Sequence, residues 1–379
     1  MKVFEPATIG SITLSNHFIR SATAEGLANR QGFCSMPMSA FMVKLAKGGA
    51  GLIITGHIAV SSEGRAGERQ LCIWNDHHLP ALMDMTRQVH EAGGKIVAQI
   101  SHAGIFANTS LTGEAAMGPM VRRLSDATIC REMTSIDIRN TVKAFANSSR
   151  LVKEAGFDGV QIHAAHGYLL SSFLSPHYNT RHDEYGGTAE NRSRFLLEVV
   201  QAVRASTGSN FPVLVKMNAN DFLANGMGID DMIYAATALE TSGISAIELS
   251  GGTRESDGMI PARPGSIKPE NEGYYKEEAR YFKEKIGIPL ILVGGFRTLS
   301  VAEQFLQDGI CDFIAMARPF ICEPDLIMRW KNREQNYSSC NSDNLCYLPV
   351  QAGKGLYCLT QVRKKNQAPG LNRPTLSGH

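Results

Sequence analysis

EAGFDGVQIHAAHGYLL, residues 154–170, contains the signals from which the fold can be read. A glycine ends a predicted helix, and GVQIHAA (159–165) follows as an almost continuous apolar run. Such a run is typical of a strand that is buried on both faces of a parallel sheet. His163 and His166 stand at the end of this strand, and Tyr168 follows them. We therefore interpret the stretch as one helix–strand unit with polar side chains at the carboxyl end of its strand.

The same unit recurs along the chain. Strands are predicted at 18–23, 51–58, 95–102, 159–165, 213–219, 246–252, 289–295 and 313–319. Helices are predicted at 37–47, 78–92, 137–155, 191–206, 229–242, 274–285 and 298–307. This alternation predicts an α/β fold, a (β/α)8 TIM barrel, with an open doubly wound sheet as the alternative.

Three further features organise the chain. ATIGSITLSN (7–16) predicts an N-terminal hairpin that plugs the bottom of the barrel. The barrel is expected to span 1–331, and 332–379 is a polar C-terminal extension, or tail. Ser300 and Glu303 have the spacing of a capping box. Long connections at 104–133, 175–190 and 253–272 should lie at the C-terminal face, where barrel active sites form.

Composition excludes several classes of protein. The 379 residues are 43% hydrophobic and 20% charged, with a net charge of +2. This balance argues against nucleic acid or an anionic membrane as a partner. The N-terminus has no apolar signal region, so we expect a cytoplasmic protein. Cys34, Cys72, Cys130, Cys311 and Cys322 are interpreted as isolated reduced thiols; Cys340, Cys346 and Cys358 cluster in the tail.

Polar groups and glycines gather at the predicted strand ends. They are Gln99, His102, His163, His166, Lys216, Asn218, Ser250, Gly294, Gly295 and Arg318. In a barrel they would converge on one pocket. The loops after the last two strands favour a phosphate site, because glycines and helix N-termini expose N–H groups. The alternative is that the two glycines only turn the chain and that Arg318 is a surface charge.

The two histidines leave three hypotheses open. A metal site needs three or four ligands, and no third ligand has a diagnostic spacing, so no metal is expected. Both rings could have only a structural role, with their hydrogen bonds made inside the core. Alternatively, two imidazole N–H groups could polarise one substrate oxygen. Tyr168 could then donate a proton, or it could only pack its ring.

A longer stretch carries a family resemblance. HAAHGYLLSSFLSPHYNTRHDEYGGTAENRSRF (163–195) resembles the signature of the Old Yellow Enzyme family of FMN-dependent ene-reductases and NADH:flavin oxidoreductases. NHFIRSAT, GLIITG, AQISHAG, LVKMNANDF, VGGF and MARPF extend the resemblance over about 3–330. It is nearest the branch of 2,4-dienoyl-CoA reductase.

The resemblance implies an FMN site and a reaction. FMN would contact Ser21, Ala22, Thr23, Ala24, Gly56 or His57, Gln99 and Lys216, with its phosphate on Gly294, Gly295, Ala317 and Arg318. NADH or NADPH would reduce it. His163 and His166 would bind the oxygen of an activated alkene, hydride would pass to the β-carbon, and Tyr168 would protonate the α-carbon in a ping-pong cycle. The expected partner is therefore a small molecule, and a homo-oligomer is left open.

The chain also departs from the family. Ala24 stands where relatives often have Thr or Cys, and Lys216 where many have Arg. The 2,4-dienoyl-CoA reductase branch has four spaced cysteines; here only three remain, at altered spacing, so no 4Fe–4S cluster is expected. We expect no FAD or NAD domain after the tail, so NADH or NADPH should reduce FMN directly. Alternatives are a flavin carrier, an NADH:flavin or nitro-compound reductase, or an aldolase with Lys216 as Schiff base.

Overall fold

The computed structural model describes residues 1–123, 129–265 and 267–367. Eight parallel strands form a closed barrel, because β14 pairs with β3 and β10 pairs with both β6 and β11. The barrel strands are β3 (Phe18–Arg20), β4 (Leu52–Ile54), β6 (Ile96–Ser101), β10 (Gly159–Ala164), β11 (Val213–Asn218), β12 (Ala246–Ser250), β13 (Leu290–Val293) and β14 (Phe313–Met316). The predicted barrel is confirmed. The second predicted strand divides into β4 and β5 (Ile58–Ala59), which pairs with β6.

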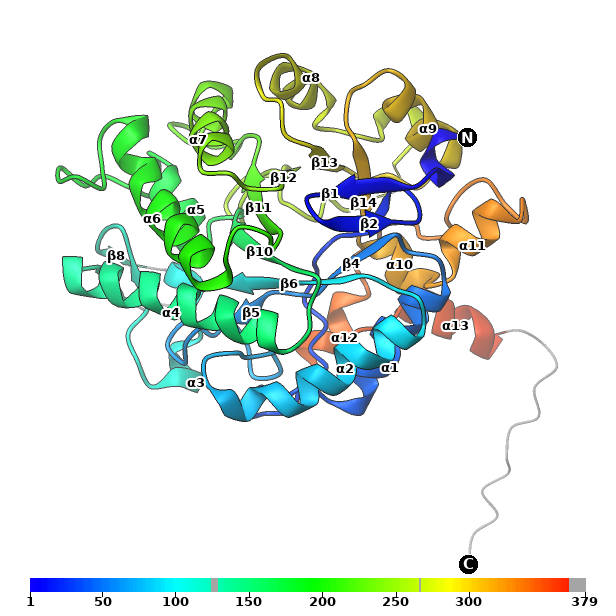
Figure 1. The fold of residues 1–379 in the computed structure, drawn as a ribbon, viewed down its shortest axis with the longest axis horizontal. Helices are drawn as coiled ribbons and strands as arrows, with labels where there is room; N and C mark the ends of the chain where they lie inside the picture. Colours follow the sequence, from blue (N-terminus) through cyan, green and yellow to red (C-terminus); the bar gives the residue numbers. More distant parts are fainter. Residues whose placement is uncertain (124–128, 266, 368–379) are drawn as a thin grey trace, which may run out of the picture.

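Helices surround the barrel (Figure 1). The helices predicted between strands are α1 (Met36–Lys47), α2 (Leu79–Glu91), α4 (Ser135–Glu154), α6 (Ala189–Thr207), α7 (Ile229–Thr241), α8 (Lys276–Lys285) and α9 (Leu299–Gln307). Shorter helices, not predicted, are α3 (Thr109–Thr112), α5 (Leu169–Leu174), α10 (Arg318–Cys322), α11 (Leu326–Lys331), α12 (Tyr347–Gln351) and α13 (Leu359–Gln367). Short 3-10 turns are η1 (Lys2–Phe4), η2 (Asp76–His78), η3 (Gly104–Phe106) and η4 (Pro269–Asn271).

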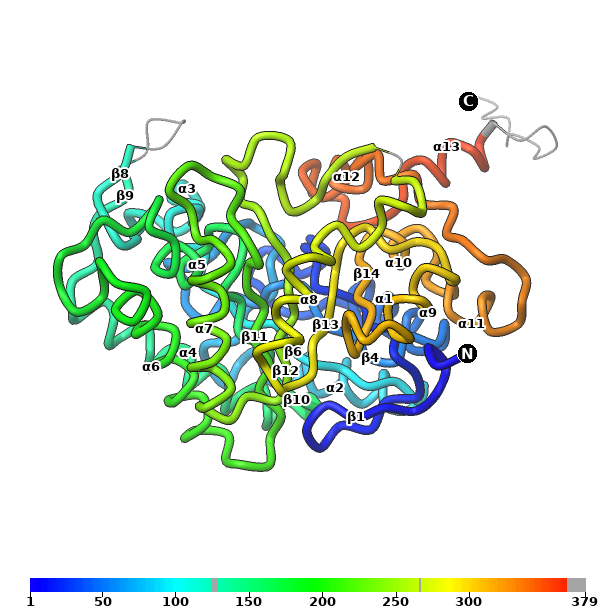
Figure 2. Tube along the Cα trace, turned by 90° about the horizontal axis from the view of Figure 1, so that it is seen from above, coloured from blue at the N-terminus to red at the C-terminus, as the bar shows by residue number. Residues whose placement is uncertain are grey.

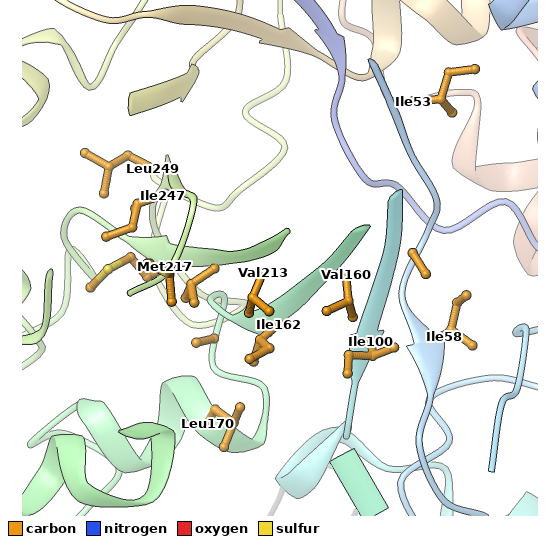
Figure 3. Packing of buried hydrophobic residues seen from close by; sticks show 14 of the residues in the cluster. Ile53, Ile58, Ile100, Val160, Ile162, Leu170, Val213, Met217, Ile247 and Leu249 are labelled. Carbon is orange, nitrogen blue, oxygen red and sulfur yellow. The ribbon is translucent and has the colours of Figure 1, made fainter. Parts of the chain in front are cut away.

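The strands alternate between two environments, as the period of two in a β-strand requires. In β10, Val160 and Ile162 belong to the main hydrophobic core, which also contains residues of the surrounding helices. Figure 3 shows part of this layer, with Val160, Ile162 and Val213 on neighbouring strands and Leu170 of α5 nearby. The residues that alternate with Val160 and Ile162 along β10, namely Gln161 and His163, therefore face the barrel interior.

The barrel interior is itself divided along its axis. At its lower end, a separate apolar cluster contains Leu214, Ala246 and Ile291 of the strands. Ile9 and Ile12 of the hairpin β1 (Ala7–Ile9)–β2 (Ile12–Leu14) join this cluster. The hairpin therefore closes the bottom as predicted, and polar residues follow one step higher on the same strands.

The opposite end carries the longest insertions. Figure 2 shows α12 and the β8–β9 segment on one side of the molecule and β1 on the other. The connection after β6 contains β7 (Met117–Gly118), β8 (Arg122–Arg123) and β9 (Ile129–Glu132); its residues 124–128 lie outside the described part. The tail reaches the same face, so the carboxyl ends of the strands are covered by segments from two distant parts of the chain.

The predicted capping box at Ser300 and Glu303 is wrong. The N-cap of α9 is Thr298, and its side chain makes no capping hydrogen bond. The Glu303 carboxylate instead accepts the backbone N–H groups of Lys2 and Val3, at 2.9 and 3.1 Å. A long-range contact to the N-terminus therefore replaces the local one, because the two free N–H groups of η1 compete for the same carboxylate.

Candidate functional site

One cavity at the C-terminal face collects nearly all of the predicted site residues. The predicted residues that line it are Ser21, Ala22, Thr23, Ala24, His57, Gln99, His163, His166, Tyr168, Lys216, Gly295, Ala317 and Arg318. Gly56 and Gly294 do not line it. The Gly56 N–H donates to Glu25, and the Gly294 carbonyl accepts from Gly273 and Tyr274. These two glycines therefore support the cavity wall from behind.

A buried polar network forms the floor of this cavity. Lys216 Nζ donates to Glu248 at 2.8 Å and to the Ser21 hydroxyl at 2.9 Å, and Ser21 donates to Glu248 at 2.5 Å. Gln99 donates to Gln161 at 2.7 Å, and Gln161 donates to the other oxygen of Glu248 at 2.9 Å. Glu248 is completely buried. Its carboxylate therefore balances the Lys216 cation, and a free amine for a Schiff base is not presented.

The network also engages one side of the Gln99 amide. One of its N–H groups donates to Gln161, and its carbonyl oxygen remains as an acceptor. The neighbouring registers Gln161↔Gln99 and Lys216↔Glu248 place these side chains in one layer. A ligand group that rests on this layer meets an acceptor at Gln99 and an ammonium at Lys216.

The two histidines and Tyr168 stand above this floor. The ring centroids of His163 and His166 are 5.3 Å apart, and those of His163 and Tyr168 are 4.9 Å apart. His166 Nε2 contacts the Ser250 hydroxyl at 2.7 Å, and the backbone N–H of His166 donates to Asn218 Oδ1. His163 Nδ1 is buried and, among the described residues, has no hydrogen-bond partner. A buried polar atom without a partner is costly to the fold.

Both imidazoles are uncharged near neutral pH. Burial lowers the pKa of His163 and of His166 well below the usual value, and for His166 the Lys216 cation is the next cause. His57 lies in the same group, 5.4 Å from the Tyr168 ring centroid. Burial, followed by the charge of Arg254, lowers the pKa of His57 to about 4. His163 and His166 can therefore donate N–H groups as neutral imidazoles, without a change of protonation state.

The loop that follows β3 is anchored from below. Arg20 is completely buried and forms an ion pair with Glu25 at 2.9 Å. Arg20 also donates to the Ile54 carbonyl at 2.5 Å. A β-carbon at Gly56 would lie 2.1 Å from the Glu25 carboxylate, so only glycine fits there. Residues 21–24 are thus held in a fixed turn against the cavity.

The far end of the cavity is basic and is formed partly by the tail. Arg318 is 8% exposed and donates to the carbonyls of Arg263 and Ser342 and to Asn344 Oδ1, at 2.8–3.1 Å. Gly295 has φ 78°, and a β-carbon there would lie 2.5 Å from Ile267. The tail therefore orients the Arg318 side chain, and Gly295 allows close packing beside it.

Sequence reasoning missed several lining residues. They are Arg254, Pro261, Ala262, Tyr274, Val293, Phe296, Arg297, Ala315, Met316, Pro319, Ser342 and Tyr347. Thr23 Oγ1 contacts Tyr347 Oη at 3.4 Å, across 324 residues of chain. Ser250, which the sequence placed at the end of a strand, does line the cavity. The tail residues carried no such signal.

The tail cysteines are arranged differently from the prediction. Cys322 is not isolated: Gln361 Nε2 donates to its Sγ at 3.4 Å, and its thiol contacts Ser339 at 3.6 Å. Its pKa is lowered to about 6, first by a hydrogen bond with Cys358. Cys340 and Cys346 are buried. Within 1–123, 129–265 and 267–367, no group of three or more His, Cys, Asp or Glu side chains could hold a metal ion.

In the part of the chain that is described, none of the helices combines the length and the apolar character that crossing a bilayer requires.

Comparisons with known proteins identify the family and the fold of the chain. The family model described as "NADH:flavin oxidoreductase / NADH oxidase family" matches residues 2–336. A 4,4'-dithiodibutanoate disulfide reductase from Rhodococcus erythropolis is 32% identical over 93% of this chain and 93% of its own. The solved structure of an old yellow enzyme homologue from Zymomonas mobilis is 27% identical, covers 89% of this chain and 94% of its own, and has a TM-score of 0.76.

Some similar proteins are much longer. A 2-naphthoyl-CoA reductase in complex with 2-naphthoyl-CoA has a TM-score of 0.89 and 25% identity over 96% of this chain. The present chain spans only 57% of that protein.

Proposed function

Because the chain belongs to the NADH:flavin oxidoreductase / NADH oxidase family, whose members are FMN-dependent NAD(P)H oxidoreductases, we propose that it reduces the carbon–carbon double bond of activated alkenes. The observation that carries this proposal is the group of His163, His166 and Tyr168, with ring centroids 4.9 and 5.3 Å apart, over a polar floor in one cavity. A carbonyl-activated alkene has an oxygen for the two imidazoles and a carbon that must receive a proton.

The donor set of the cavity fits FMN. Gln99 offers an acceptor, Lys216 a cation and Arg318 a second cation at the far end, which suit a flat polar ring with a phosphate. The small side chains of Ala22 and Ala24 leave room for a flat ring. FMN, when bound, supplies hydride transfer at its N5 atom, with NADH or NADPH as the reductant.

Lys216 differs from a simple anchoring cation. Its ammonium is already paired with the Glu248 carboxylate at 2.8 Å. The pair places a positive end toward the ring and a negative charge behind it, so its net field is smaller than that of an isolated lysine. We infer that Glu248, which is not itself among the lining residues, moderates how strongly Lys216 stabilises added negative charge.

The two histidines would bind the oxygen that activates the alkene. An N–H donor that points at this oxygen stabilises the negative charge that develops there as the β-carbon receives hydride. Neutral imidazoles suit this role, because they donate without losing a proton. Both imidazoles line the cavity, which supports the assignment.

Tyr168 would complete the reaction. Its ring borders His57, His163 and Phe106, so the phenol is held at the cavity rather than on the outer surface. A phenol O–H can donate its proton, so Tyr168 would protonate the α-carbon on the side opposite to hydride delivery.

A second candidate function is the reduction of small disulfides. It is favoured by the Rhodococcus protein, which is similar over nearly the full length of both chains and is described as a disulfide reductase. In this case the same polar network would hold FMN and the same reductant would be used. No α-carbon would then need a proton from Tyr168.

The variant Tyr168→Phe separates these functions. We expect it to slow enone reduction by about a hundred-fold, the usual contribution of a positioned acid, while NADPH still bleaches the flavin at the normal rate. Stopped-flow absorbance measures both half-reactions, with cyclohexenone and 4,4'-dithiodibutanoate as oxidants. If the wild type consumes the disulfide but not the enone, the second candidate is correct. If NADPH bleaches the flavin but the reduced enzyme reduces neither the enone nor the disulfide, a flavin carrier is the better description.

A further inference from the structure

A second cavity opens from the proposed active site. It has a volume of about 840 Å³ and shares Ala24, His57, Tyr168, Arg254 and Tyr347 with the first cavity. Its remaining walls come from residues 25–28, 66–71 and 350–353, together with Arg30, Met38 and Asn108. A molecule whose reacting end lies beside Tyr168 can therefore extend into this second space.

The charges of the second cavity are not balanced. Its two carboxylates already have cationic partners: Glu25 is paired with Arg20 at 2.9 Å, and Glu68 with Arg30 at 3.2 Å. Arg69 and Arg254 also line this cavity. Among the described residues, neither guanidinium forms an ion pair or donates a side-chain hydrogen bond.

Arg254 is oriented even though it has no acidic partner. Its guanidinium carbon lies 4.6 Å from the ring centroid of Phe106 and 6.0 Å from that of Tyr168. Stacking on aromatic faces holds a guanidinium while leaving its N–H groups free in the plane. The adjacent Glu255 does not neutralise it, because this carboxylate faces Arg122 at 2.7 Å and His177 at 3.4 Å.

We propose that Arg254 and Arg69 form a binding subsite for an anionic group, a carboxylate or a phosphate, of a molecule that reacts beside Tyr168. The inference rests on the proposed function and narrows its substrate class. Two sources of this group are compatible with the chemistry: an alkene substrate with a remote carboxylate or phosphate, or the phosphates of the nicotinamide reductant. Arg254 would contact the anion near the junction of the cavities, and Arg69 would contact it further along.

The experiment compares charged and neutral reactants that share the same reacting atoms. 4-Carboxycinnamaldehyde and its methyl ester differ only in the remote charge. NADPH and 1-benzyl-1,4-dihydronicotinamide carry the same dihydropyridine ring, but only NADPH has phosphates. For each pair, the ratio of kcat/KM or of flavin-reduction rate constants, charged over neutral, reports recognition of the anion. Both ratios are measured in the wild type and in Arg254→Met, Arg254→Lys and Arg69→Met.

We expect at least one ratio to fall about ten-fold in Arg254→Met and in Arg69→Met, since a hydrogen bond to a charged group typically gives a factor of this size. Arg254→Lys should keep most of the ratio. Arg139→Met, at an exposed arginine of α4 that lines neither cavity, is the matched control and should keep both ratios. The pair whose ratio falls identifies the source of the anion.

The proposal is overturned if both ratios stay within two-fold in both methionine variants, or if charged and neutral partners lose rate equally. Failure of the proposed function looks different: the wild type would then reduce neither cinnamaldehyde. In that case the nicotinamide pair still decides the subsite, because it does not depend on an alkene.

Discussion

The two histidines after β10 are held in different ways. His166 has a positive φ of 65°, and Ser250 and Asn218 fix its ring and its backbone. A non-glycine residue in the left-handed region is strained and persists only where the surroundings hold it. His163 lies on the regular strand and keeps an unpartnered Nδ1 within the described structure. One ring is therefore anchored, while the other has a buried nitrogen without a partner among the described residues.

Replacing both rings tests the proposed oxygen clamp. We expect His163→Ala with His166→Ala to abolish the binding of phenolic ligands, because both donors to the phenolate oxygen are removed. FMN should remain bound, since its proposed contacts lie at Gln99, Lys216 and Arg318. Spectral titration with 4-hydroxybenzaldehyde measures the first effect and flavin content the second. Unchanged phenol binding in the double variant would rule out the clamp.

At the level of elements, the loop after β3 depends on a buried ion pair. Arg20 ends the strand, and Glu25 returns to it after four residues that line the cavity. The same carboxylate accepts the Gly56 N–H at 2.8 Å, so it joins the carboxyl ends of β3 and β4. Neither residue was singled out from the sequence, because both lie in an ordinary strand-to-loop transition.

Removing this carboxylate should destabilise the whole fold. Glu25→Ala leaves the Arg20 guanidinium buried without its counter-ion, which typically costs about 3–5 kcal/mol. The free energy of unfolding, measured by urea titration, should fall by this amount, and flavin content should fall with it. Glu25→Gln is the matched variant: it keeps an acceptor for Gly56 and should cost less. A loss below about 1 kcal/mol for the alanine variant would contradict the anchoring role.

The molecule as a whole places its polar groups in the upper half of the barrel. This arrangement buries imidazoles that cannot easily take up a proton. His102 is 2% exposed, and burial lowers its pKa to about 4. In the unfolded chain the same ring has a pKa near 6.5. The unfolded state therefore binds more protons between about pH 6.5 and pH 4, and stability falls as the pH decreases through this window.

We expect His102 alone to contribute about 1–3 kcal/mol to this loss on acidification from pH 7.5 to pH 4.5. His102→Asn keeps an acceptor for the Gly104 N–H and should reduce the pH dependence of the unfolding free energy by this amount. His182→Asn, at an exposed site, serves as the control and should behave as the wild type. Equal pH dependence in all three proteins would exclude a contribution from His102.

The strands and the convergence of the site could be predicted from the sequence for a local reason. Apolar runs between helix-ending glycines specify parallel strands, and parallel strands bring their carboxyl ends to one face. Side chains at those ends, such as Gln99, His163 and Lys216, therefore had to meet. The motif after His163 added the family resemblance, and the matching family model supports the same assignment.

Only the tertiary structure decided which distant partners those side chains have. Glu248 neutralises Lys216 because β11 and β12 are neighbours in register. Ser342 and Tyr347 enter the cavity because the tail folds back over the barrel. Glu303 binds the N-terminus instead of capping its own helix. Sequence patterns record periodicity and local spacing, whereas these contacts join residues 32 to 324 positions apart. Their geometry exists only once the barrel has closed.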